Sequence, residues 1–565
     1  MKIRIFTAGL ALFIVQAAFA LNQGELERFF PPAKRFARLD QVLRINFPDV
    51  RQSQAKPEVF NQAVDFNNQG LAELRNGNAN EAEALFSRAC KLVPGEKGFW
   101  NNLLLATRKI KGNELRSVDI AKRVMALDNE NYQAAHIAGL VLLNDLDRPL
   151  DAIAFLNHAF ERSNQDASIA VALATAYEKA GYSESAFEIL KLHAHRATDD
   201  PYPIYLLGLQ YLEREDFNPA IRAFNSARAA DTKGYAHDAW IRARYYAGQL
   251  EGLADDCRKV LRKFPEVMNR QSLERILFSL ASQDFRFEER VKIKINDASA
   301  IERLDFLVRP IPELAGHQTT RLASAEIVSG ANSTRAQVVD RDQNGRLRIS
   351  VPRDQIRQEF ILKLVHRIQT VPLLGSQVKA NSERKPEIKY AALSEKYSVE
   401  NDQLALLADR IERQPGNFVQ MATKAVSTGL KYLENYEDFS VEWALRNPDN
   451  CDCTEFSRLL AALCLRKDTP ARMATGFLVK PELMGQETSI GHAWCEVFFP
   501  GRGWIPIDPT LQSTMHWAYF GNLLSDQIYF GEASDNASRI SIDYTSTRSE
   551  MQVNLSGSFI ISRWQ

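Results

Sequence analysis

The sequence predicts a multidomain protein: an all-α helical-hairpin repeat solenoid, then an antiparallel β-sandwich, then a C-terminal α+β domain. Three observations predict this order. At 565 residues, the chain is longer than one hydrophobic core usually serves. Small residues recur with a period of about 34 between residues 61 and 265, and after residue 285 the apolar period changes from helical to alternating. A cysteine-rich helix followed by a strand pair then marks the last domain.

The charges of the chain balance. Lysine and arginine together number 70, and so do aspartate and glutamate. This balance removes any bulk electrostatic reason to expect nucleic acid or an anionic membrane surface as a partner.

The first twenty residues predict a secretory signal peptide. Lys2 and Arg4 precede a short apolar run, and Ala18 and Ala20 supply the small residues of a cleavage site. A membrane anchor is the less favoured alternative, because the run falls short of the roughly 18 apolar residues that a span needs. We therefore expect a periplasmic or secreted protein, with a signal peptide at 1–20, an N-terminal extension at 21–60 and no membrane span after signal removal.

Residues 61–285 predict stacked helical hairpins, because small residues at a fixed period let paired helices approach closely. The repeated positions are Ala82, Ala152, Ala186 and Ala220, and Gly70, Gly139 and Gly208. This pattern resembles a tetratricopeptide repeat array of five or six units, of which the second, residues 101–128, departs most from it. The resemblance implies a groove for a peptide or protein partner; an unrelated helical solenoid is the alternative. The histidines of these helices form no metal-ligand set, so we expect structural or solvated roles for His136, His158, His193 and His195.

Residues 286–375 predict a small antiparallel β-sandwich. Apolar and polar residues alternate in runs such as "RFEERVKIKIN" and "RLRISVP", and Asn344-Gly345 is typical of a hairpin turn. His317 and His366 stand alone there, and we expect no catalytic role for them.

The stretch "NPDNCDCTEFSRLLAALC", residues 447–464, places a cysteine at the start of a helix. From Thr454 onward the apolar residues follow a helical period, so Cys453 lies at or just before the first turn. Free backbone amides and the helix dipole favour a thiolate there, which makes Cys453 the expected nucleophile. Cys451 lies two residues earlier, outside the electrostatic field of the helix start. Cys464 and Cys495 are expected to be buried and structural, either as thiols or as a bridge.

A strand pair further along supplies the partners that a thiol nucleophile needs. His492 begins one apolar strand, and the returning strand ends at Asp508. Side chains alternate between the faces of a sheet, and residues opposite each other on paired strands share a face. Because His492 is even-numbered, it lies on the same face as Asp508 only if the residue opposite Asp508 is also even-numbered. A four-residue loop at 500–503 would place Cys495 there instead. We therefore predict an odd-numbered loop or a glycine bulge at Gly501 or Gly503.

These motifs together resemble the transglutaminase-like superfamily of papain-type cysteine enzymes. The matching residues are Asp452-Cys453, "LLAALC", "TPAR" at 469–472, "HAWCEV", "GW" at 503–504 and "DPT" at 508–510. The resemblance assigns residues 376–565 to a transglutaminase-like catalytic domain, with Cys453 as nucleophile, His492 as general base and Asp508 as its orienting group. Two departures are Cys451 in place of the usual glycine and Asp468-Thr469 before "PAR". No ligand cluster predicts a metal, and no cofactor is expected.

The expected function is that of an exported cysteine protease, amidase or acyl transferase, which attacks a peptide or protein amide through a thioester. The alternative is an envelope scaffold whose repeats bind partners and whose transglutaminase-like domain is inactive.

Overall fold

The computed structural model divides the chain into two compact units, residues 33–240 and residues 1–32 with 241–565. The residues that the structure describes are 28–30, 36–41, 43–48, 55–194, 201–375, 397–434, 439–532, 539–548 and 550–564. The expected signal peptide at 1–20 lies outside them. Among the helices so described, none combines the length and the apolar character that crossing a membrane requires.

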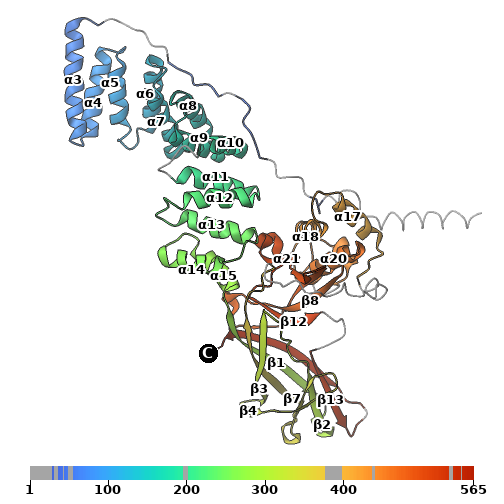
Figure 1. Cartoon of the computed structure of the whole chain (residues 1–565). Coiled ribbons are helices and arrows are strands. Elements are labelled where there is room, and N and C mark those ends of the chain that lie inside the picture. Colours follow the sequence, from blue (N-terminus) through green and yellow to red (C-terminus); the bar gives the residue numbers. More distant parts are fainter. Residues whose placement is uncertain are drawn as a thin grey trace, which may run out of the picture. The chain divides into compact units, whose positions relative to one another are not determined.

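The first unit consists of stacked helical hairpins (Figure 1), which confirms the expected repeat solenoid. Their small residues serve the packing that the sequence predicts: a Cβ added to Gly70 or Gly208 would lie 2.7 or 2.5 Å from the ring of Phe86 or Phe224 on the next helix. The helices are α3 (Pro57–Arg75), α4 (Ala79–Leu92), α5 (Lys97–Thr107), α6 (Glu114–Leu127), α7 (Tyr132–Leu140), α8 (Pro149–Arg162), α9 (Ala167–Lys179), α10 (Ser183–His193), α11 (Tyr202–Glu213) and α12 (Phe217–Ala227).

Part of the N-terminal extension lies along these repeats as extended chain. The Leu39 N–H donates to the Ser185 hydroxyl at 3.0 Å, and Arg38 pairs with Glu188 at 3.0 Å. The side chains of Leu39, Leu43 and Ile45 pack on the apolar core of the repeats. The described residues 36–48 of the extension therefore belong to the folded repeat unit.

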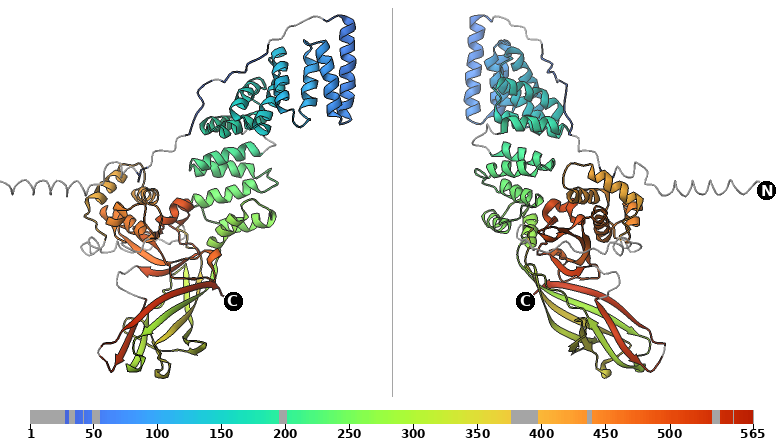
Figure 2. Two further views of the ribbon diagram at one scale, coloured as in Figure 1. Left: turned by 180° about the vertical axis from the view of Figure 1, so that it is seen from behind. Right: turned by 45° about the vertical axis from the view of Figure 1, so that its right-hand side comes forward.

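Helical hairpins continue into the second unit with α13 (Tyr235–Tyr246), α14 (Leu253–Lys263) and α15 (Arg270–Leu280). The two-sheet sandwich follows (Figure 2). One sheet has the order β4-β3-β7-β1-β14-β9 and the other β13-β2-β6-β5. The bounds are β1 (Gln283–Ile295), β2 (Ile301–Val308), β3 (Gln318–Ser329), β4 (Asn332–Arg335), β5 (Gln337–Arg341), β6 (Leu347–Ser350), β7 (Glu359–Thr370), β9 (Glu487–Thr488), β13 (Ile540–Ser546) and β14 (Val553–Arg563). Gly345 has φ 75° in the turn between β5 and β6, where the sequence predicts a hairpin.

The last two strands differ from the expected domain 376–565. β13 pairs with β2, and β14 pairs with β1 over its whole length, so residues 540–563 complete the sandwich rather than the catalytic domain. The sequence places these residues in the C-terminal domain, because the pairing that joins them to the sandwich is made with residues more than 200 positions away and local patterns do not show it.

The C-terminal α+β domain consists of a four-stranded antiparallel sheet, β11-β10-β8-β12, covered by helices. Its central helix, α20, contacts β8 and β10 and is buried along most of its length. The elements are α17 (Asp402–Glu412), α18 (Phe418–Gly429), α19 (Val441–Arg446), α20 (Cys453–Arg466), β8 (Ala471–Leu478), β10 (His492–Phe499), β11 (Gly503–Ile507), α21 (Pro509–Met515), the 3₁₀ turn η6 (His516–Tyr519) and β12 (Gln527–Glu532).

Candidate active site

Cys453 is the first residue of α20, as the sequence predicts. A capping box starts the helix: the Asp452 carboxylate accepts the Thr454 N–H at 2.7 Å, and the Glu455 carboxylate accepts the Asp452 N–H at 2.7 Å. The first N–H groups of a helix lack intrahelical acceptors and carry the positive end of its dipole. The Cys453 sulfur and its backbone N–H therefore both lie in an environment suited to negative charge.

The other three cysteines of this region are buried, and burial raises the pKa of each thiol. All six cysteines of the chain are free thiols, so no bridge joins Cys464 and Cys495. Burial, with the Glu455 and Asp452 carboxylates nearby, raises the pKa of Cys451 to about 12, and its thiol donates to the Asn447 carbonyl at 3.4 Å. Burial also raises the pKa of Cys464 to about 12. The choice of Cys453 over Cys451 therefore agrees with the geometry.

His492 and Asp508 face each other across the sheet. Cys495 pairs with Ile507 and Phe499 with Gly503, so the register places Asp508 opposite Trp494, an even-numbered residue on the same face as His492. The predicted odd loop is confirmed: residues 500–502 connect the strands, and Gly501 and Gly503 both have φ 78°. His492 Nε2 donates to Asp508 Oδ2 at 2.6 Å.

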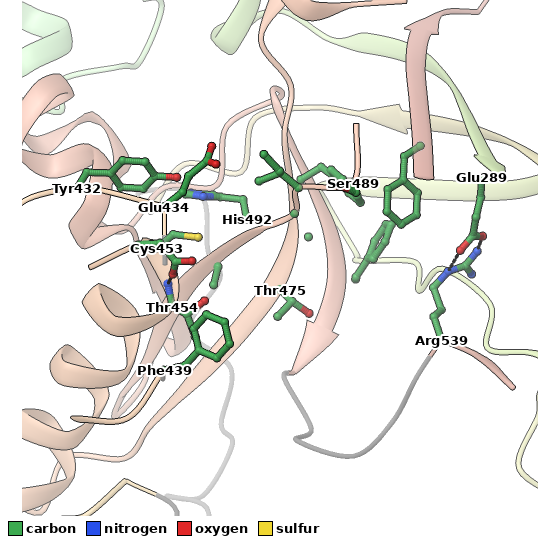
Figure 3. A pocket seen from close by; sticks show the side chains of 18 residues that line it. Glu289, Tyr432, Glu434, Phe439, Cys453, Thr454, Thr475, Ser489, His492 and Arg539 are labelled. Atoms are coloured by element: carbon green, nitrogen blue, oxygen red, sulfur yellow. Dashed lines mark hydrogen bonds and ion pairs between the residues drawn. The ribbon is translucent and has the colours of Figure 1, made fainter. Parts of the chain in front are cut away.

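The electrostatics of this pair favour an imidazolium next to the thiol. Burial by itself would lower the pKa of His492, but the Asp508 carboxylate and hydrogen bonds to Asp508 and Cys453 raise it to about 10. Because Nε2 bonds to Asp508, Nδ1 is the ring nitrogen left for the sulfur. Figure 3 shows the sulfur and the imidazole side by side at one end of a pocket. The three predicted residues thus lie together, with the imidazole between the thiol and the carboxylate.

Asp508 is itself held in place by the helix that follows it. Its Oδ1 accepts the Thr510 N–H at 3.1 Å and the Leu511 N–H at 3.2 Å, which caps the start of α21. Its own N–H donates to the Tyr519 carbonyl in η6 at 3.2 Å. One carboxylate oxygen is therefore committed to the helix and the other to His492, which fixes the orientation of the imidazole.

A pocket of about 440 Å³ lies beside the sulfur and the imidazole (Figure 3). Three exposed apolar side chains belong to its lining: Tyr432, Phe439 and Ile490. Thr475, Gly476 and Phe477 of β8 line it further in. This volume is in the range of pockets that bind ligands in proteins.

Sequence reasoning missed a contribution of the N-terminal extension to this domain. Phe29 is 2% exposed and packs so closely on α18 that a Cβ at Gly429 would lie 2.1 Å from its ring. Arg28 donates to the Gly429 carbonyl at 2.8 Å and pairs with Asp449 at 2.9 Å. Asp449 lies in the loop that leads to Cys453, so these contacts brace the approach to the nucleophile. The Phe29-Phe30 pair, which stands among polar residues, is the sequence signal that could have indicated that the extension packs on this domain.

The remaining side chains singled out in the sequence have structural surroundings. Trp494 is fully buried, with its ring centroid 6.1 Å from that of His492, and the Arg472 guanidinium lies 4.1 Å from the Trp504 ring. His317 is buried between the carbonyls of Val371 and Gln527. Burial lowers the pKa of His366 to about 4. In the part of the chain that the structure describes, no group of acidic, histidine or cysteine side chains could hold a metal ion.

Burial also lowers the pKa of His136, and His158 bonds to the Asn129 carbonyl at 3.0 Å. The side chains of His193 and His195 lie outside the described residues.

The helix-borne thiol, strand-borne imidazole and carboxylate define the class of this domain: an α+β domain of the papain type with a Cys–His–Asp site. Residues 405–509 match the family model of the transglutaminase-like superfamily, so this part of the chain is a transglutaminase-like domain. The match contains the nucleophile, the imidazole and the carboxylate positions. No curated protein matches the chain significantly.

Several solved structures resemble parts of this chain. The "Putative Cysteine Protease from Cytophaga hutchinsonii" is 14% identical, covering 49% of this chain and 91% of its own, with a TM-score of 0.31. PilF of Pseudomonas aeruginosa is 14% identical, covering 38% and 98%, with a TM-score of 0.32. YrrB, a TPR protein with an unusual peptide-binding site, is 17% identical, covering 31% and 91%, with a TM-score of 0.28.

Proposed function

We propose that the protein is an exported, cysteine-dependent amide hydrolase or acyl transferase that acts on a peptide or protein of the cell envelope. The observation that carries this proposal is the arrangement of Cys453, His492 and Asp508, in which a thiol at a helix start lies beside an imidazole whose Nε2 is 2.6 Å from a carboxylate. This is the arrangement that activates a thiol nucleophile.

The chemistry follows from the order of these groups. The Cys453 thiolate attacks the carbonyl carbon of the amide, and the oxyanion is stabilised by the backbone N–H of Cys453. The His492 imidazolium gives its proton to the leaving nitrogen, the C–N bond breaks and a thioester remains. His492 then takes a proton from water or a primary amine as that acceptor attacks the thioester, and the thiolate is released. Asp508 holds the imidazole in one tautomer throughout.

Water as the acceptor makes the protein a protease or amidase, and an amine makes it a transglutaminase. We favour hydrolysis, because exported bacterial members of the transglutaminase-like superfamily, which this sequence resembles, are more often hydrolases. The helical repeats would bind the protein substrate or a protein partner, in keeping with their tetratricopeptide-like pattern.

A thiol-reactive probe tests the site, and an envelope extract tests the reaction. Labelling of Cys453 should be lost in His492→Ala and kept in Cys451→Ala; equal labelling of all three proteins would instead support an inactive scaffold. Incubation of the mature chain with envelope extract should produce new peptide ends. Incorporation of an added primary amine without new ends would identify a transferase.

A further inference from the structure

The pocket beside Cys453 is built by two domains. Its lining includes Glu289 on β1, Phe559 on β14 and Arg539 just before β13, all from the sandwich, together with catalytic-domain residues. Figure 3 shows Glu289 and Arg539 at the end opposite Cys453 and His492, with Thr475 and Ser489 between them. The sandwich therefore closes the pocket at the end away from the thiol.

Backbone pairing fixes the sandwich to the segment that carries the imidazole. On β14, Phe559 lies between two neighbours: Glu289 of β1 on one side and Thr488 of β9 on the other. β9 extends the sandwich sheet, and the chain continues from it through the pocket-lining residues 489–491 to His492. The wall formed by Phe559 and the reacting groups are thus parts of one hydrogen-bonded framework.

The sandwich end of the pocket is aromatic. The ring of Phe559 lies 4.8 Å from Phe477 and 5.4 Å from Phe287, measured between centroids. Phe530 lies 5.3 Å from Phe477. Phe477, Phe530 and Phe559 all line the pocket, and their mutual packing holds this wall in a fixed shape.

The charges at that end compensate each other. Arg539 forms an ion pair with Glu289, and its Nε donates to Glu289 Oε1 at 3.2 Å. The neighbouring His366 is neutral at pH 7, because burial lowers its pKa to about 4. The Arg539 guanidinium also lies 5.8 Å from the Phe530 ring. A charged substrate group would find no uncompensated partner there, whereas an apolar group would bury its surface against three rings.

We propose that the β-sandwich supplies the specificity site of the enzyme: Phe559, with Phe477 and Phe530, binds an apolar or aromatic side chain next to the amide that Cys453 attacks. This proposal rests on the proposed function for the identity of the reacting bond. The exposed apolar side chains of Tyr432, Phe439 and Ile490 extend the same apolar lining to the surface, as an apolar peptide segment would require.

Matched electrophiles test the proposal without knowledge of the natural substrate. Two series of peptidyl electrophiles are used, chloromethyl ketones and chloroacetamides, which place a side group on opposite sides of the reactive carbon. In each series the side group is benzyl, hydrogen or carboxyethyl. The measured quantity is the second-order rate of Cys453 alkylation in the full mature chain. In the wild type, the benzyl reagent of one series should react at least about ten times faster than the reagent with hydrogen, and the carboxyethyl reagent should show no such gain.

Variants on β14 separate a specificity role from a structural one. Phe559→Ala should reduce the benzyl preference to less than about three-fold, whereas Phe559→Leu should keep most of it. Leu555→Ala is the matched control, because Leu555 lies on the same strand, is 38% exposed and is not part of the pocket; it should keep the full preference. Unchanged preference in Phe559→Ala, no preference in either series, or faster reaction of the carboxyethyl reagent would overturn the proposal.

His492→Ala tests the proposed function separately in the same assay. If the benzyl preference is present but His492→Ala does not slow alkylation, the specificity site stands and the cysteine mechanism fails. If His492→Ala slows alkylation but no side group is preferred, the mechanism stands and the specificity site fails.

Discussion

Replacement of Asp508 by asparagine should disable the site while leaving its shape intact. The carboxylate has two tasks: Oδ1 accepts the N–H groups of Thr510 and Leu511, and Oδ2 accepts His492 Nε2–H. An asparagine can keep the first task, because its carbonyl oxygen is a good helix cap. Its NH₂ group must then face Nε2, which forces Nε2 to accept a hydrogen bond and places the ring proton on Nδ1, toward the sulfur. The imidazole would then be unable to take the thiol proton.

The size of this effect follows from the raised pKa of His492. Burial opposes the charge, and Asp508 contributes most to raising the pKa from 6.5 to about 10, which corresponds to about 5 kcal/mol in favour of the imidazolium. Loss of the carboxylate, together with the wrong tautomer, should therefore slow alkylation of Cys453 at pH 7 by about 30-fold, or about 2 kcal/mol, because an ordinary thiol with a pKa of about 8.5 is still about 3% thiolate at that pH. The thermal unfolding temperature at pH 7 should also fall, because the variant keeps the cap but loses the interaction with the His492 imidazolium that stabilises the folded state.

The assay is the rate of Cys453 modification by iodoacetamide, followed by peptide mass mapping across pH 5 to 10. Wild-type reactivity should be nearly constant through neutral pH, as expected for a thiolate–imidazolium pair, whereas Asp508→Asn should react slowly at pH 7 and gain rate only toward alkaline pH. Equal rates at pH 7 would refute the reasoning, because Asp508 would then have no influence on the thiol.

Three further predictions follow from the same contacts. Phe29→Ala should lower the free energy of unfolding by about 3 kcal/mol, because Phe29 is 2% exposed; calorimetry of the mature chain would measure it, and an unchanged transition would contradict the packing on Gly429. Cys451→Ala should keep at least half of the Cys453 alkylation rate, because burial raises the pKa of Cys451 to about 12; a loss of ten-fold or more would assign Cys451 a chemical role. Stability against urea should fall by up to about 1.4 kcal/mol per pH unit between pH 6.5 and about 10, because the folded pKa of His492 lies above its unfolded value and its contribution is lost as pH rises through the folded pKa. Asp508→Asn should lack most of that decline.

The sequence predicts the helices, strands and turns that depend on neighbouring residues, because period, alternation and capping are set by the local backbone geometry. The 34-residue period identified Gly70 and Gly208 as positions of close helix contact, and both face a phenylalanine ring. The alternation of odd- and even-numbered residues predicts the three-residue loop between β10 and β11, since side-chain direction alternates strictly along a strand. The helix start at Cys453 followed from the capping residues of the sequence.

These patterns do not predict which strands pair when the partners are far apart in the sequence. The sequence places residues 540–563 in the C-terminal domain, because their partners in β1 and β2 are more than 200 residues earlier and nothing in the local sequence encodes that choice. For the same reason the sequence placed Phe559 in the catalytic domain and left the sandwich without a role at the pocket. Phe29 was missed because a single aromatic residue in an extension has no periodicity to reveal its burial.

Direct detection of an acyl group on the nucleophile would test the central claim. The mature chain, incubated with a peptide p-nitrophenyl ester and quenched in acid, should gain the mass of one acyl group, mapped to Cys453, and the His492→Ala and Cys453→Ala chains should not. An adduct on another residue, or none in the wild type under conditions in which the ester stays intact, would contradict the account.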